Sequence, residues 1–224
     1  SRRGSIFRAI AEGAVRPSEI ATRIGLGSAA DVQVNLRNLV ELGLLERVVP
    51  ITQRDQLRHR QVIYRIADPY LRFSFTVLER RRAQIAIGPA ARVSEGLNDE
   101  ELDRYVSRIF EHVARQFAWR AAAVGRLPLP EGVGEWWDST DELDLVGVRG
   151  RAVLFAGEAK WTRAAVGLGE LDTLKRRVAR LPADQPHLLL LSRSGFSPAL
   201  QRAGGADLIG LRDLFSPDLE HERR

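Results

Sequence analysis

The 224-residue chain contains no cysteine and no methionine, and only two of its 34 basic residues, Lys160 and Lys175, are lysine. Without cysteine, neither a disulfide framework nor a thiolate metal site is possible, which fits a reducing compartment. No apolar run approaches the roughly 18 residues of a membrane span, and no charged leader precedes an apolar stretch. We therefore expect a cytoplasmic protein with no membrane partner. The absence of methionine even at position 1 suggests a fragment or a processed chain.

The chain is 44% hydrophobic, which is ample for the core of one or two domains. Its net charge of +5 is unevenly placed, because residues 1–83 hold 15 arginines against 8 acidic residues and residues 84–224 hold 19 basic against 21 acidic. An arginine-rich N-terminal part is expected of a protein that binds the phosphate backbone of DNA. The alternative is a solvated basic face without a nucleic-acid partner.

Two apolar runs, 141–148 and 153–161, are separated by Arg149-Gly150-Arg151 and predict an antiparallel hairpin of mostly buried strands. Asp144 interrupts the first run, and Glu158 and Lys160 close the second. Because alternate residues of a strand share a face, Glu158 and Lys160 should point to one side of the sheet and Ala159 to the other. In a suitable register, Asp144 joins the first two.

Two carboxylates beside a lysine are a chemically meaningful group. Paired carboxylates suit Mg²⁺ or Mn²⁺, which would acidify a water and offset charge on a phosphodiester, while a lysine positions that water or stabilises the developing anion. The alternative is a hairpin whose terminal charges are merely solvated or paired. The rarity of lysine favours the first interpretation, because lysine is a compact charge with a tunable pKa, whereas arginine stays protonated.

The N-terminal segment predicts a winged helix-turn-helix over residues 1–67. Apolar spacing indicates helices at 5–14, from Pro17 to a stop at Gly25–Gly27, and at 30–41, the last with Val34, Leu36, Leu39 and Val40 near the core. Strands are expected at 44–49 and 61–66, with a polar tip at 53–60 between them.

In such a module the third helix enters the major groove and the tip of the wing touches phosphates. The candidate DNA-binding residues are Gln33, Asn35, Arg37 and Asn38 on the helix and Arg54, Arg58 and Arg60 on the tip. Winged helices also serve as protein-docking units, so this interpretation competes with a protein partner.

Residues 68–97 predict a connector, helical or extended, whose aromatic residues pack it onto a domain. Residues 98–224 predict an α/β/α sandwich on a mixed sheet: a long helix from about 98, a strand at 135–137, the hairpin, a helix at 168–181, and strands at 187–192 and 207–210. On the second helix, Glu170 and Lys175 are candidates to face the charged group of the hairpin. No phosphate-binding loop of the P-loop type occurs, so this chain cannot itself be such an ATPase.

Asp144 with Glu158-Ala159-Lys160 resembles the PD-(D/E)xK nuclease superfamily, which has a restriction-endonuclease-like fold. The segments 142–146 and 157–161, together with 64–73 upstream, are similar to the winged helix and nuclease-like domain that form the C-terminal half of archaeal-type P-loop ATPases. The resemblance implies that Asp144 and Glu158 bind the metal, that Ala159 offers its backbone carbonyl, and that Lys160 assists the attacking water. It also implies a P-loop ATPase module as a partner. Family members often have cysteine where this chain has Ala159, which leaves a backbone role unchanged.

Many relatives also have a metal-binding glutamate on the long helix, which would be Glu111 here. The helical wheel opposes this role: nine positions of about 100° each from Leu102 place Glu111 opposite the apolar stripe, in solvent. Glu111 is nevertheless kept as a further candidate metal ligand. The sequence thus favours a DNA-binding, metal-dependent nuclease-like protein. The alternative is an inactive DNA-binding or protein-docking module on a nuclease scaffold.

Overall fold

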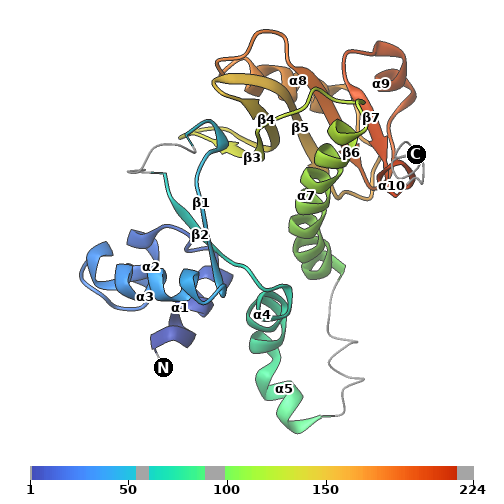
Figure 1. Ribbon diagram of the computed structural model, residues 1–224. Helices are drawn as coiled ribbons and strands as arrows, with labels where there is room; N and C mark the ends of the chain where they lie inside the picture. Colours follow the sequence, from blue (N-terminus) through green and yellow to red (C-terminus); the bar gives the residue numbers. More distant parts are fainter. Residues whose placement is uncertain (1, 54–60, 89–98, 216–224) are drawn as a thin grey trace. The chain divides into compact units, whose positions relative to one another are not determined.

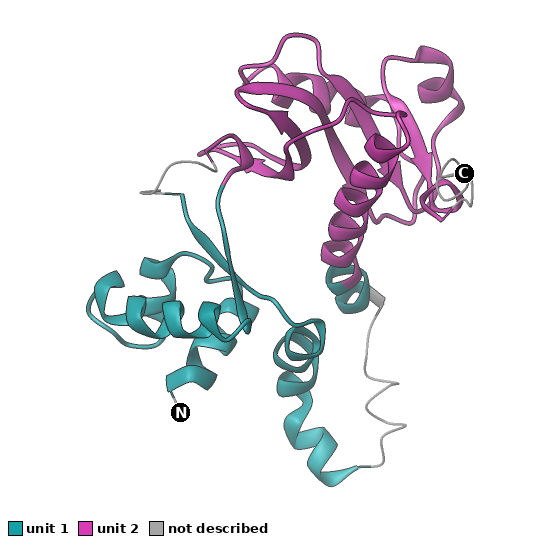
Figure 2. Ribbon diagram, in the orientation of Figure 1, with its two compact units in different colours: residues 1–49, 55–105 teal, residues 50–54, 106–224 magenta. Residues whose placement is uncertain are grey.

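The computed structural model describes residues 2–53, 61–88 and 99–215. The chain forms two compact units, one of residues 1–49 and 55–105 and the other of residues 50–54 and 106–224 (Figure 2). Arg54, Arg58 and Arg60, the predicted tip residues, lie outside the described residues. No helix in the described ranges is both long and apolar enough to cross a membrane.

The first unit begins with three helices, α1 (Arg2–Ala11), α2 (Pro17–Arg23) and α3 (Ala29–Glu41), which pack around one apolar cluster (Figure 1). The strands β1 (Leu45–Val48) and β2 (Ile63–Ile66) then pair antiparallel. Side-chain caps start two of the helices: Glu19 accepts a hydrogen bond from the Arg16 amide (3.0 Å), and Asp31 accepts one from the Ser28 amide (3.0 Å). The helices and strands expected from the sequence here are confirmed.

Val34 is the exception within α3. It is 62% exposed, whereas Val32, Leu36 and Leu39 are fully buried, so the prediction that Val34 faces the core was wrong. Val34 lies two residues from both Val32 and Leu36, a rotation of about 200° around the helix, and therefore falls on the opposite side. It shares this exposed side with Arg37 and Asn38.

The connector is helical over its described part, with α4 (Pro69–Phe73), η2 (Ser74–Leu78), η3 (Glu79–Arg81) and α5 (Arg82–Ile87) following one another. Two of its three aromatic residues, Phe73 and Phe75, pack within the first unit as expected, whereas Tyr70 is 70% exposed. Phe75 stacks on Phe7 of α1 with 5.0 Å between ring centroids, and Phe73 meets Tyr105 edge-on at 5.5 Å. Tyr105, near the start of α7 (Asp99–Ala123), also donates a hydrogen bond to the Pro69 carbonyl (2.9 Å).

The second unit contains a mixed sheet, described as five strands in the order β3-β4-β5-β6-β7. The strands are β3 (Gly132–Trp137), β4 (Glu142–Arg149), β5 (Ala152–Lys160), β6 (His187–Ser192) and β7 (Asp207–Gly210). Neighbours from β3 to β5 are antiparallel and those from β5 to β7 are parallel, which confirms both the mixed sheet and the β4–β5 hairpin. The short helix η1 (Ile51–Gln53) packs against β3 and β4.

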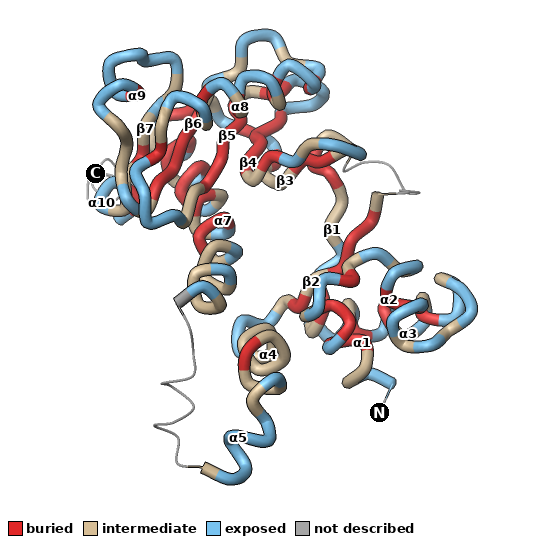
Figure 3. The backbone as a smooth tube through the Cα atoms, turned by 180° about the vertical axis from the view of Figure 1, so that it is seen from behind, coloured by how far each residue is buried: buried red, intermediate tan, exposed pale blue. Residues whose placement is uncertain are grey.

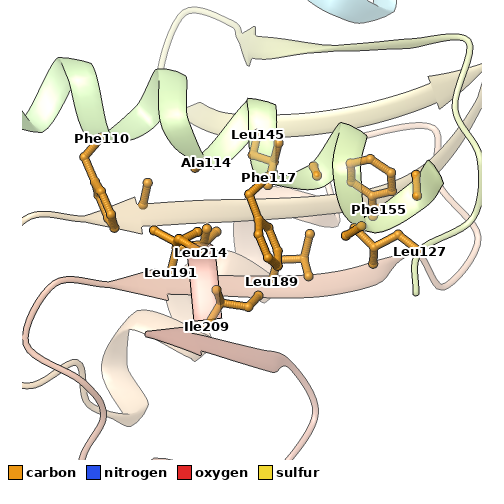
Figure 4. Packing of buried hydrophobic residues seen from close by; sticks show 14 residues of the cluster. Phe110, Ala114, Phe117, Leu127, Leu145, Phe155, Leu189, Leu191, Ile209 and Leu214 are labelled. Carbon is orange, nitrogen blue, oxygen red and sulfur yellow. The ribbon is translucent and has the colours of Figure 1, made fainter. Parts of the chain in front are cut away.

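Helices cover both faces of this sheet. On one face, Phe110 and Phe117 of α7 and Leu214 of α10 (Leu211–Leu214) pack with Phe155 and Leu189 of the strands (Figure 4). On the other face, the helices α8 (Leu168–Val178) and α9 (Pro198–Ala203) contribute Leu171, Leu174 and Leu200 to a second apolar cluster. The central strands are consequently buried along much of their length, as Figure 3 shows.

Candidate functional site

The register of β4 and β5 brings the candidate acidic residues to neighbouring positions. Leu145 of β4 pairs with Gly157 of β5 in an antiparallel register. The next residues toward the end of the hairpin, Asp144 and Glu158, therefore lie opposite each other. Gly157 allows β5 and β6 to approach closely, because a Cβ there would lie 2.6 Å from the Leu189 carbonyl oxygen. The site therefore lies where β4 begins and β5 ends.

Glu158 and Lys160 occupy the face of the sheet that α8 covers, as their spacing predicts. The Lys160 Nζ atom lies 3.2 Å from Glu158 Oε2 and 3.1 Å from Oε2 of Glu170 on α8. Ala159 points the other way and packs into the apolar cluster under α7. Glu158 is buried, with 3% of its surface exposed, whereas the Glu170 side chain is 42% exposed, so Lys160 links a buried carboxylate to one at the surface.

Asp144 is held through its backbone and its side chain. Its Oδ2 atom accepts a hydrogen bond from the Ala159 amide (3.0 Å), and its carbonyl accepts one from Nη1 of Arg115 on α7 (2.9 Å). Arg115 also pairs with Glu135 of β3 through a 3.1 Å contact between Nη2 and Oε1. Asp144 is thereby tied to the strand that carries Glu158 and to the helix on the α7 face.

Glu111 is only 7% exposed, so the expectation that it faces solvent was wrong. The prediction was made relative to Leu102, but residues 99–105 of α7 belong to the first unit and the rest of α7 to the second. The position of Leu102 therefore does not define the buried side of α7 in the second unit. Glu111 lies three and seven residues before Ala114 and Ala118, which are core residues of the second unit, and so shares their side of the helix. Its carboxylate pairs with Arg108 (3.1 Å).

Burial and nearby negative charges raise the pKa values of three carboxyl groups. Desolvation is the main cause for Asp144, Glu111 and Glu158, and the pKa of Glu158 rises to about 7. The charge of Asp144 is the second cause for both Glu111 and Glu158, which places these groups within electrostatic reach of one another. Burial alone would lower the pKa of Lys160, but Glu158 and Glu170 outweigh it and raise that pKa. Lys160 is therefore a cation at neutral pH.

Sequence reasoning missed one prominent member of the site, Arg177 of α8. Its Nη1 atom donates a 2.6 Å hydrogen bond to Glu158 Oε1. Arg177 lies seven residues after Glu170, hence on the same side of α8, and that spacing was a usable signal. Lys175 does not join them, contrary to our expectation. It lines a concavity of about 660 Å³ with His187 and Asp207, at the opposite ends of the parallel strands.

The donor chemistry fits a hard divalent cation. Asp144 and Glu158 supply carboxylate oxygens and Ala159 has a backbone carbonyl. The raised pKa values of the two carboxyl groups result first from burial and then from nearby negative charge, and a bound cation would offset both. Within the described ranges, no group of three or more Asp, Glu or His side chains is arranged to hold a metal ion. Such an ion would therefore depend on two protein carboxylates and take its remaining ligands from water or phosphate, as Mg²⁺ often does.

The candidate DNA-binding residues on α3 differ in exposure. Arg37 and Asn38 are exposed, whereas Gln33 and Asn35 are half-buried. No acidic side chain of the described residues forms an ion pair with Arg37, although several other arginines of this unit are paired, such as Arg23 with Glu12 (2.6 Å) and Arg8 with Glu79 (2.8 Å). Arg37, Asn38 and Val34 thus form an outward-facing strip on α3, which we call the α3 strip.

Comparisons with known proteins reach the same region of the chain. The DUF234 family, described as archaeal and bacterial proteins of unknown function, matches residues 74–175, a range that contains Glu111, Asp144, Glu158 and Lys160. The chain is also 29% identical over 164 residues to the uncharacterized protein MJECL04 of Methanocaldococcus jannaschii. That alignment covers 70% of this chain and 35% of the archaeal protein, so the chain spans about a third of its relative.

One solved structure, the crystal structure of protein VC1899 from Vibrio cholerae, aligns over 97% of this chain and 52% of its own, with 14% identity and a TM-score of 0.27. A likeness at that level carries no argument about fold or function. The comparisons thus relate the chain to archaeal and bacterial proteins of unknown function.

Proposed function

We propose that this chain is a DNA-binding protein whose second unit is a restriction-endonuclease-like domain that cleaves phosphodiester bonds with Mg²⁺ or Mn²⁺. The observation that carries this proposal is that Asp144, Glu158 and Lys160 lie together at one end of the interior strands β4 and β5, in a mixed sheet with helices on both faces. These are the residues that the PD-(D/E)xK resemblance assigns to catalysis.

Each residue has a distinct role in this proposal. Asp144, Glu158 and the Ala159 carbonyl would hold the divalent ion, which when bound supplies a water of lowered pKa and offsets charge on the phosphodiester. Lys160, cationic and held by Glu158 and Glu170, orients the attacking water and stabilises negative charge that develops on the phosphate. Glu111 lies within electrostatic reach of Asp144 and can help to orient water on the α7 face.

The first unit, in this proposal, is a winged helix that positions the DNA. Its three helices and the β1–β2 hairpin provide the framework, and the α3 strip would enter the major groove. Arginine contacts guanine and asparagine contacts adenine there, while an apolar side chain such as Val34 suits the thymine methyl group. We further propose that a P-loop ATPase module acts with this chain, because the resemblance to archaeal-type P-loop ATPases implies one; the archaeal relative is long enough to contain such a module outside the aligned region.

A second function rests on a specific observation. Both oxygens of Glu158 already contact protein cations, Arg177 at 2.6 Å and Lys160 at 3.2 Å, so the acidic group is largely neutralised without a metal. A regulatory module that binds DNA or docks a protein, on an inactive nuclease scaffold, would have such a site.

Cleavage of plasmid and branched DNA distinguishes the two functions. The full chain is assayed with Mg²⁺, Mn²⁺ or chelator, beside Asp144→Asn and Glu158→Gln, which keep size and remove one charge each. The nuclease proposal expects metal-dependent cleavage that both substitutions reduce by about 100-fold or more, the scale of removing one preorganised catalytic group. Glu142→Gln, an exposed neighbour on β4, is the matched control and should cut like wild type. Wild-type DNA binding without cleavage would favour the regulatory module.

A further inference from the structure

Charged side chains of alternating sign run without a break from the β3–β4 turn to the start of α8. We call this series the charge chain, and in order its members are Asp138, Arg180, Asp141, Arg177, Glu158, Lys160 and Glu170. The candidate residues Glu158 and Lys160 stand near its centre. Of the remaining members, Glu170 and Arg177 lie in α8, Arg180 lies two residues after α8 ends, and the two aspartates lie in the turn before β4.

The contacts on the turn side differ in quality from the contact at Glu158. Arg180 donates hydrogen bonds from both Nε and Nη2 to Asp138 Oδ2, at 2.8 and 2.5 Å. Arg177 reaches Asp141 through a longer contact, 3.4 Å between its buried Nε atom and Asp141 Oδ1. Its contact with Glu158, at 2.6 Å, is short and charge-assisted. Arg177 is therefore anchored mainly by Glu158, and Arg180 by the turn.

Two consequences follow for Glu158. A short hydrogen bond to one oxygen restricts the rotation of the carboxylate and so fixes the direction in which its second oxygen points. The guanidinium of Arg177 also repels any metal ion that binds the same carboxylate. This repulsion is weakly screened, because Glu158 is buried. The same guanidinium thus orders the ligand and weakens its attraction for a metal.

From these contacts we propose that Arg177 is a positioning residue for Glu158, one that lowers divalent-cation affinity while it holds the carboxylate in the orientation that cleavage needs. This inference rests on the proposed nuclease function. It differs from the usual expectation for a residue behind a metal ligand, whose loss lowers metal affinity and activity together. Here, loss of Arg177 raises affinity and lowers activity.

The test is Mn²⁺ binding by the full chain at pH 8, measured by titration calorimetry and by electron paramagnetic resonance of free Mn²⁺, with DNA cleavage at saturating Mn²⁺. For Arg177→Gln we expect about tenfold tighter Mn²⁺ binding, from removal of one nearby positive charge, and cleavage reduced at least about tenfold. Arg177→Lys retains the charge but not the planar fork, so its Mn²⁺ affinity should stay near wild type while its cleavage falls.

Arg180→Gln is the matched control, because it removes the same charge from the same charge chain without touching Glu158. It should change both quantities by less than about twofold, since its charge is exposed and screened. Melting temperatures show that each variant is folded.

Each outcome decides the matter. If Arg177→Gln binds Mn²⁺ no more tightly than wild type, or cleaves DNA as fast as wild type, this inference is wrong but the proposed nuclease function is unaffected. The same holds if Arg180→Gln reproduces both effects, because the cause is then general electrostatics. If wild type binds no Mn²⁺ with or without DNA, the proposed nuclease function fails and this inference fails with it.

Discussion

Lys160 and Arg177 both contact Glu158, but with different chemistry. Lys160 brings a compact ammonium held between two carboxylates, whereas Arg177 brings a planar fork from the covering helix. Only 2 of the 34 basic residues are lysine, so the compact cation stands out at the position where a reacting phosphate would lie. Substitutions of single residues around Glu158 therefore test the proposed chemistry most directly.

Replacing Lys160 with arginine should reduce cleavage by about 100-fold or more, because a bulky fork cannot take the place of a preorganised ammonium. Folding should change little, since the charge and the two carboxylate partners remain. The measurement is the single-turnover cleavage rate at equal melting temperature. Arg151→Lys, an exposed exchange in the hairpin turn, is the control and should leave the rate unchanged. Equal cleavage by Lys160→Arg would show that the rarity of lysine has no bearing on its role.

Glu158 should make stability depend on pH. Its pKa is raised from 4.5 to about 7 in the folded state, so the folded protein binds this proton more tightly than the unfolded chain does. The stabilisation is complete below about pH 4.5 and is lost as pH rises to about 7, at most about 3 kcal/mol for this shift. Without metal, wild type should therefore lose more stability than Glu158→Gln over that range.

Urea unfolding followed by tryptophan fluorescence measures this effect in the right place, because all four tryptophans (119, 136, 137 and 161) lie in the second unit. Glu41→Gln, on exposed α3 in the other unit, should keep the wild-type pH dependence. Saturating Mn²⁺ should restore the lost stability at pH 7.5 and not in Glu158→Gln. Parallel pH curves for wild type and Glu158→Gln would show that burial of this carboxylate has no energetic cost.

At the scale of elements, the β4–β5 hairpin depends on a glycine beside the site. A Cβ at Gly147 would lie 2.1 Å from the ring of Phe155, which is fully buried and belongs to the core under α7. Neither the ring nor the strand can move away without disturbing that core. Close packing of β4 on Phe155 therefore has a sequence requirement that strand propensity alone does not reveal.

Gly147→Ala should destabilise the second unit by about 1–3 kcal/mol or more, the usual cost of overpacking a core. The same change at Gly169, in the first turn of α8 with nothing within 4 Å of the added Cβ, should be neutral or slightly stabilising. Urea unfolding by tryptophan fluorescence compares the two. Equal stability of both variants would mean that β4 shifts to admit the methyl group.

At the scale of the whole molecule, charge is divided along the chain rather than spread evenly. Residues 1–83 carry a net charge of +7 and residues 84–224 a net charge of −2. If the basic part contacts DNA, binding should weaken steeply as salt rises, and the steepness should come from that part of the chain.

Replacing Arg54, Arg58 and Arg60 together with glutamine should weaken DNA binding and flatten the plot of log affinity against log salt. The slope should change by about 0.9 for each duplex phosphate that the protein no longer neutralises. Three exposed arginines from the C-terminal part of the chain, Arg126, Arg151 and Arg202, provide a control with the same change in net charge. Their replacement should leave the slope near wild type. Fluorescence anisotropy at several salt concentrations gives both slopes, and an unchanged slope in the first variant would place the DNA surface elsewhere.

Features that depend on local periodicity could be predicted from the order of residues. The two-residue period of a strand placed Glu158 and Lys160 on one face and Ala159 on the other, and apolar spacing located α3, α7, α8 and the strands of the mixed sheet. These features follow from backbone geometry within one element, which the amino-acid sequence specifies directly.

Which element each face meets depends instead on tertiary packing. Val34 fits a helical pattern yet lies outside the core. Glu111 is buried because the part of α7 in the second unit buries a different side of the helix from the part in the first unit. Arg177 meets Glu158 across 19 residues of sequence because α8 packs over the end of β5, and the raised pKa of Glu158 results from burial that no local pattern encodes. The physical reason is that desolvation and ion pairing depend on packing between elements, which periodicity within an element leaves open.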